Sequence, residues 1–146
     1  MDGIPALAIL VIYSVLMSPL AMAQSSVGLA TVVRLGEVDL GLEGASISPD
    51  GGVVIAHGAD STVFLIDPES PENHSKLDHP GNLTMHDSSF HPGSNTALVV
   101  GDGGGVLRFV RSNNSLEDVG GGLLFGSTDL MAVSWNSDGS WAYIGG

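Results

Sequence analysis

The sequence predicts an all-β protein made of short antiparallel strands, for two reasons. Over 146 residues, 21 Gly and seven Pro are set among many Val, Ile and Leu, a composition typical of short strands joined by tight turns. In addition, the turn sequence Ser-Pro-Asp-Gly at residues 48–51 recurs in similar form around Pro92 and Ser137. Pro49 and Pro92 are 43 residues apart, and Pro92 and Ser137 are 45 apart. The chain therefore has an internal repeat of nearly constant length.

Strands are expected on either side of these turns. Each turn leads into an apolar run that ends in glycine, at residues 53–58, 97–101 and 141–145. A further strand is expected in the first two copies, at residues 62–67 and 105–110, after a turn that contains Gly and Asp. Because inner strands of stacked sheets are covered on both faces, they read as nearly continuous apolar runs.

Polar segments separate the copies. Residues 68–82 and 112–122 are rich in Pro, Ser, Asn, Gly and acidic side chains, so we expect at most a weak outer strand in each. The best positions for these strands are residues 76–77 and residues 115–116.

The order of these features resembles the WD40 repeat: an apolar strand, a Ser-Pro-Asp-Gly turn, a second apolar strand, Gly, an Asp-containing turn and a strand that ends in Asp. Residues 45–67 carry the best copy. Asp67 stands where that family has the Asp of its Trp-Asp dipeptide, Ile66 replaces the Trp, and Val110 replaces the Asp in the second copy. The same turn is similar to those of lactonase-like and Tol-associated propellers. The resemblance covers about residues 42–146 and implies antiparallel blades of a β-propeller.

The expected organisation is a signal peptide, a lead-in and a partial propeller. Closed propellers have about four to eight blades, whereas the chain has room for about two and a half. We therefore expect an incomplete ring that is the amino-terminal part of a longer propeller, with self-assembly of partial rings as the alternative. Residues 31–35 would then be an early strand that pairs with the last blade of a complete ring. The expected segments are residues 1–23, 24–41 and 42–146, with repeats at about 42–82, 83–126 and 127–146.

The amino-terminal segment predicts export. Residues 4–20 form an uncharged apolar run, and Ala21-Met22-Ala23 is the small-x-small pattern that signal peptidase accepts, so we expect cleavage after Ala23. A retained membrane anchor is the alternative, although Pro5 and Pro19 shorten the helical run. The predicted location is secreted, cell-surface or periplasmic.

Charge and residue inventory exclude several functions. Four Lys and Arg against 16 Asp and Glu give a formal net charge of −12, which disfavours a nucleic-acid partner. The chain contains no Cys, so it has no thiol nucleophile and no thiolate metal site. The histidines lack the spacing of a helical metal site, and we expect them mainly in turns and loops: His57, His74, His79, His86 and His91.

No catalytic, cofactor-binding or metal-ligating residue is predicted. Four turn carboxylates are expected to cap backbone amides, and they are Asp50, Asp60, Asp102 and Asp138. The glycine-rich residues 101–105 and 120–122 lack the dinucleotide-binding pattern and predict hairpin turns. His86 with Ser88 and Asp87, or Ser127 with Asp129, makes no predicted catalytic triad.

Two function classes stay open. A binding scaffold would recognise a protein, peptide or glycan through loops on one face, and it is the class that we favour. A propeller enzyme, of the lactonase-like hydrolase or quinoprotein dehydrogenase type, is the alternative. Sequons at Asn73, Asn82 and Asn113 allow N-glycosylation of an exported chain. Trp135 and Trp141 are expected to pack between blades, with stacking on a ligand as the alternative.

Overall fold

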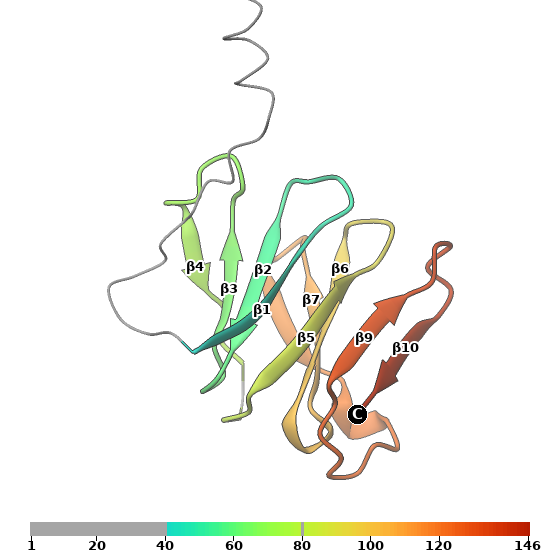
Figure 1. Ribbon diagram of the computed structural model, residues 1–146. Helices are drawn as coiled ribbons and strands as arrows, with labels where there is room; N and C mark the ends of the chain where they lie inside the picture. The colour runs from blue at the N-terminus through green and yellow to red at the C-terminus, as the bar shows by residue number, and fades with distance from the viewer. Residues whose placement is uncertain (1–40, 80) are drawn as a thin grey trace, which may run out of the picture. The chain divides into compact units, whose positions relative to one another are not determined.

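Strands joined in chain order make up the described structure (Figure 1). The computed structural model describes residues 41–79 and 81–146, which lie in a single compact unit. The predicted signal peptide and the early strand at residues 31–35 lie outside these described residues.

The described residues form three antiparallel sheets. The first sheet has the order β1-β2-β3-β4, the second β5-β6-β7-β8, and the third pairs β9 with β10. The all-β prediction with antiparallel pairing is confirmed. The strands of the first sheet are β1 (Leu42–Ile47), β2 (Val54–Gly58), β3 (Val63–Ile66) and β4 (His74–Lys76). Those of the other two sheets are β5 (Met85–Phe90), β6 (Thr96–Gly101), β7 (Val106–Val110), β8 (Ser115–Asp118), β9 (Ala132–Trp135) and β10 (Ala142–Gly145).

The predicted apolar runs are strands, and the two weak outer strands are present as β4 and β8. The glycine-rich segments differ from each other. The 3₁₀ turn η1 (Asp102–Gly104) joins β6 to β7, so the first predicted hairpin turn is correct. The 3₁₀ turn η2 (Gly120–Gly122) lies between β8 and β9, which belong to different sheets. The hairpin prediction was wrong there because the local glycine pattern does not reveal the partner of the following strand.

The two four-stranded sheets share one register. Ile47 pairs with Val54 in the first sheet, and Phe90 pairs with Ala97 in the second, 43 residues further on in both strands. Each first strand also has an irregularity near its start, between Leu42 and Gly44 and between Met85 and Asp87. Such bulges bend a strand and increase its twist.

Glycines are required where the second strand ends. A Cβ on Gly58 would lie 1.9 Å from the Gly41 carbonyl oxygen, and a Cβ on Gly101 would lie 2.0 Å from that of Thr84. Neither distance is compatible with a side chain, so only glycine fits these positions. In the third sheet β10 ends at Gly145 as predicted, but the close approach is made by the next residue, Gly146, since a Cβ on Gly145 would meet no atom within 4 Å.

Apolar side chains fill the spaces between the sheets. The larger cluster of buried side chains joins the first and second sheets and includes Ile55, Val99 and Phe109, all fully buried. Burying each such side chain contributes roughly 1.5–3 kcal/mol. Phe90 and Phe109 meet edge to face, with ring centroids 6.1 Å apart. A second cluster, with Val100 and Val133, joins the second and third sheets.

Candidate functional site

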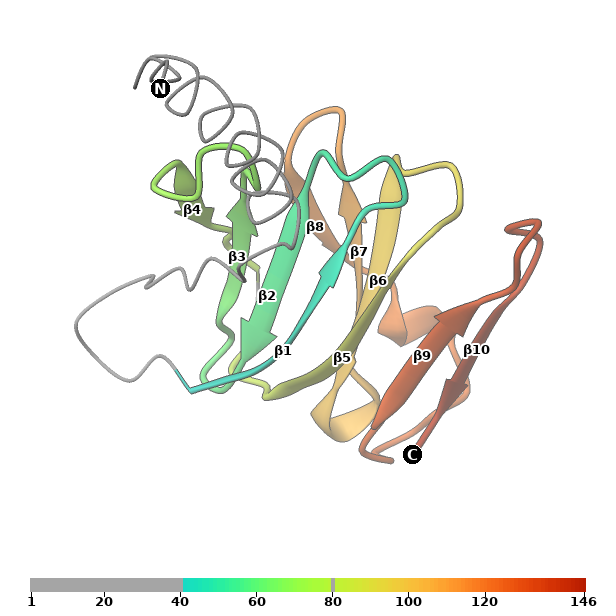
Figure 2. The same ribbon diagram turned by 45° about the horizontal axis from the view of Figure 1, so that its top comes forward.

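Turns gather at one end of the sheets (Figure 2). The turn between β1 and β2 is closed by the Ser48 N–H, which donates to Val53 O at 2.8 Å, while the Ser48 hydroxyl accepts from the Val53 N–H at 3.0 Å. Gly51 supplies the positive φ, +72°, that reverses the chain. Corresponding backbone bonds close the next two turns, from His91 to Thr96 and from Asn136 to Trp141.

An ion pair connects this end of the first sheet to the second. The Arg111 guanidinium, which follows β7, donates to Asp50 Oδ2 at 2.5 Å and to Ser94 O at 3.3 Å. The Ser48 hydroxyl also donates to Asp50, at 2.6 Å. Hydrogen bonds from Ser48, from Arg111 and from the Gly52 amide lower the pKa of Asp50 to about 2. Asp50 is therefore ionised over the whole physiological range, and the Arg111 charge is balanced.

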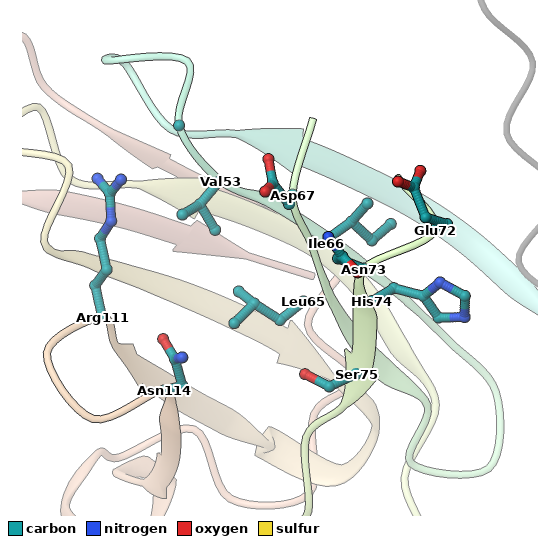
Figure 3. A pocket seen from close by; sticks show the side chains of 11 residues that line it. Val53, Leu65, Ile66, Asp67, Glu72, Asn73, His74, Ser75, Arg111 and Asn114 are labelled. Carbon is teal, nitrogen blue, oxygen red and sulfur yellow. The ribbon is translucent and has the colours of Figure 1, made fainter. Parts of the chain in front are cut away.

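A groove of about 610 Å³ opens beside this ion pair (Figure 3). Val53 and Leu65 line it with apolar surface, and Ser75 of β4 lies on its wall. Polar side chains line the rest, and they are Asp67, Glu72, Asn73, His74, Arg111 and Asn114. The groove thus joins a small apolar patch to a larger set of polar groups. Because Arg111 is paired with Asp50, the carboxylates of Asp67 and Glu72 give the groove its net negative charge.

The groove was not predicted as a site. Its residues come from four separate segments, and each segment reads in the sequence as an ordinary strand or polar loop. Only the stacking of the two sheets brings Leu65 near Arg111. The polar loop compositions were the available signal, since they predicted that residues 68–82 and 112–122 lie at the ends of strands.

A second polar cluster connects β1 of the first sheet to β5 of the second. His86 Nδ1 lies 2.7 Å from Glu43 Oε2, and His86 Nε2 lies 2.7 Å from Asp102 Oδ1. The hydrogen bonds to Glu43 and then to Asp102 raise the pKa of His86, because both ring nitrogens donate only in the cationic form. The His86 bond in turn lowers the pKa of Asp102. His86 therefore links Glu43 of the first sheet to Asp102 of the second, and both contacts favour its protonated form.

Asp87, the neighbour of His86 in the sequence, has other partners. Asp87 does not orient the His86 ring. Its two carboxylate oxygens accept instead from the backbone amides of Ser88 and Val133, at 2.9 and 2.8 Å.

The remaining histidines are mainly structural. His74 packs edge to face on Phe64, at 5.8 Å, and His91 does so on Trp135, at 4.9 Å. The expectation that the histidines lie mainly in turns and loops was wrong, since His57 lies in β2, His74 in β4 and His86 in β5. His57 has only 1% of its surface exposed. Its ring Nδ1 donates to Met85 O at 2.9 Å. Among the described residues, no group of three or more His, Asp or Glu is arranged to hold a metal ion.

The four carboxylates that were predicted to cap backbone amides in turns differ in how far they do so. Asp50 and Asp138 accept the amides of Gly52 and Ser140, at 3.1 and 2.8 Å, as expected. Hydrogen bonds from Ser140 lower the pKa of Asp138. Asp102 is used mainly by His86, and Asp60 has a positive φ of +53°.

The sequons and the tryptophans occupy different environments. Asn73, Asn82 and Asn113 are all exposed.

Trp135 packs against the second sheet and donates its indole N–H to Ser89 O at 3.2 Å, as predicted for packing between sheets. Trp141 is 68% exposed, so that prediction was wrong for it in the described structure.

Comparisons with known proteins leave the site to be interpreted on its geometry. No protein-family model matches the sequence, and no curated protein matches it either. In the part of the chain that the structure describes, no helix is long and apolar enough to cross a membrane.

Proposed function

We propose that this chain is an exported binding scaffold whose sheets are blades of a WD40-like β-propeller, and that its groove binds an extended peptide carrying a basic side chain. The observation that carries the proposal is the groove between the first and second sheets, whose lining combines apolar side chains with the carboxylates of Asp67 and Glu72.

Strand order and register support the blade assignment. Both four-stranded sheets follow chain order, as blades do, and their equivalent pairs differ by 43 residues. The first strand of each sheet also contacts that of the next, β1 with β5 and β5 with β9, as inner strands around a shared axis would. The apolar run at residues 4–20 and the small-residue pattern at Ala23 support export.

An edge strand supports a peptide as the ligand. β4 pairs only with β3 among the described strands, and its residues His74 and Ser75 line the groove together with Asn73, which precedes it. An exposed strand edge presents backbone donors and acceptors to which an extended peptide can add as a further strand. The carboxylates of Asp67 and Glu72 favour a Lys or Arg side chain in that peptide.

The alternative of a propeller enzyme has less support. Among the described residues, the Ser48 and Ser140 hydroxyls donate to carboxylates, but those carboxylates, Asp50 and Asp138, also accept backbone amides and stabilise turns. His86 is held between two carboxylates. No arrangement in the described residues therefore favours that alternative.

The first experiment selects peptides from a random library displayed on phage, with the full chain immobilised as the target. Peptides that bind the groove will lose binding to Ser75→Trp, because the indole fills the groove. They will retain binding to Lys76→Trp, the matched control, because Lys76 is the next residue of β4 and does not line the groove.

Two substitutions that each remove one carboxylate test whether the ligand is basic. Glu72→Gln should weaken the selected basic peptides about two- to fivefold, the effect of one exposed charge, whereas Glu69→Gln outside the groove should not. Selected peptides that bind Ser75→Trp as well as the parent chain, or a library that yields no binder, would refute the groove proposal. Export is tested separately: the protein secreted with its own amino-terminal segment should begin at Gln24.

A further inference from the structure

The sequons differ in where they lie relative to the groove. One of them begins at Asn73 and ends at Ser75, and both of these residues line the groove (Figure 3). A second begins at Asn113, in the turn between β7 and β8, and its middle residue Asn114 lines the groove from the second sheet. Two sequons are thus at the groove, and only that of Asn73 has its acceptor side chain in the lining.

The Asn82 sequon lies at the other end of the first sheet. Its neighbours Gly81 and Leu83 are held by Ser61, whose hydroxyl donates to Gly81 O at 2.6 Å and accepts from the Leu83 N–H at 3.1 Å. Ser61 belongs to the turn between β2 and β3, whereas the groove lies where β3 ends and β4 begins. A substituent on Asn82 is therefore attached far from the groove.

The backbone around Asn73 fixes the point at which a substituent would be attached. The Asn73 N–H donates to Ser70 O at 2.7 Å, and the Asn73 backbone carbonyl accepts from the Asp67 N–H at 3.3 Å. These bonds hold Asn73 in the turn that enters β4, where the residue is exposed. A group on its side-chain amide therefore begins at the groove and not beyond it.

The lining of the groove suits a sugar chain. A sugar ring has hydroxyl groups around its rim and C–H groups on its faces. Val53 and Leu65 offer an apolar surface to the C–H groups. Ser75 and Asn114 offer hydrogen bonds to the hydroxyl groups. Because N-linked glycans are bulky and hydrophilic, one attached to Asn73 will cover the residues beneath it.

We propose that Asn73 carries an N-linked glycan in the exported protein and that this glycan closes the groove. The oligosaccharide comes from a lipid-linked diphosphate donor. Asn73 Nδ2 forms a bond to the anomeric carbon of the first sugar and loses one proton to the transferase, while the bond from that carbon to the diphosphate oxygen breaks and the lipid diphosphate leaves. The groove is then regulated by modification, because chains that remain unmodified at Asn73 keep it open. The inference rests on the proposed export and, for its effect on binding, on the proposed peptide ligand.

Occupancy is tested on the full chain secreted from a eukaryotic cell line. Enzymatic removal of glycans in heavy-oxygen water, followed by peptide mass spectrometry, should find the isotope at Asn73. Secreted protein that is unmodified at Asn73 would overturn the inference and leave export standing. Protein that stays in the cell without a glycan would overturn both.

Hydroxyl-radical footprinting tests whether the glycan closes the groove, and it needs no ligand. Every chain compared carries Asn113→Gln, so that the neighbouring turn has no glycan. Adding Asn73→Gln should raise the labelling of Leu65 about twofold or more, because a bulky group no longer covers that side chain. Adding Asn82→Gln, the matched control, should leave the labelling unchanged.

The same chains made in a bacterial cytoplasm carry no glycan and should label equally at Leu65. This comparison separates covering by the glycan from any effect of Asn73→Gln on the fold. Equal labelling of Leu65 in the secreted chains with and without Asn73→Gln would overturn the inference.

Peptide binding gives the last comparison. Peptides selected on the unglycosylated chain should bind the secreted Asn113→Gln chain about tenfold more weakly, and adding Asn73→Gln should restore their binding. Peptides that bind all of these chains equally would overturn the inference and leave the groove proposal standing. A library that yields no binder for any chain refutes the groove proposal instead, and the labelling of Leu65 then decides the inference by itself.

Discussion

Replacing Gly101 by Ala tests whether the close approach of the second strand to the start of the first holds each sheet together. The new Cβ would lie 2.0 Å from Thr84 O and 3.0 Å from Met85 Cα, and both are backbone atoms that no rotamer change can move. The strands would have to separate by more than 1 Å, roughly the shortfall from ordinary van der Waals contact. Overpacking of this kind costs about 1–3 kcal/mol and sometimes more, and the loss of glycine's flexibility in the unfolded chain offsets about 0.4–1 kcal/mol of that.

We therefore expect Gly101→Ala to lower the free energy of unfolding by about 2 kcal/mol, measured by urea denaturation followed by circular dichroism. For a domain of this size the loss corresponds to a decrease in Tm of roughly 6–10 °C. Gly121→Ala is the matched control, because a Cβ there would meet no atom within 4 Å and its φ is not positive. If the two variants unfolded within about 0.5 kcal/mol of each other, the steric argument would be wrong.

Two further predictions concern titrating groups. His86 has its pKa raised above 6.5 by Glu43 first, so the stabilisation from this link is complete below about pH 6.5 and is lost as the pH rises through the raised value. The Tm difference between the parent chain and His86→Gln should accordingly shrink from about pH 6 to about pH 9, and a difference that grew would contradict the assignment. Ser48→Ala should raise the pKa of Asp50 more than Arg111→Met does, because the Ser48 hydrogen bond is the larger cause of its depression. A carboxyl-carbon NMR titration measures both shifts, and the reverse order would refute this ranking.

The strands could be predicted because their signals are local. The run at residues 53–58 is apolar and follows a turn sequence, and both features act within a few residues. The groove and the His86 link could not be predicted in this way. Glu43 and His86 are 43 residues apart in the sequence, and nothing near either residue indicates that the other lies 2.7 Å away.

The burial of side chains also depends on contacts that the local sequence does not reveal. His57 lies in a strand that was predicted, yet its complete burial depends on the second sheet, which supplies Met85 O as its acceptor. Trp141 shows the opposite case, since its apolar character predicted burial and the described structure leaves it exposed. Sequence patterns thus indicate which residues form strands, whereas the stacking of sheets decides which of their faces are covered.

The strict chain order of each sheet also bears on how the molecule folds. Within the described residues, every hydrogen-bonded strand pair joins neighbours in the sequence, so each sheet closes only short loops as it forms. Low contact order of this kind favours rapid folding, and it allows the first sheet to form while later residues are still being synthesised. We expect the docking of one finished sheet on the next to be the slower step, and the bond between Arg111 and Asp50, which joins the first two sheets, can form only at that stage.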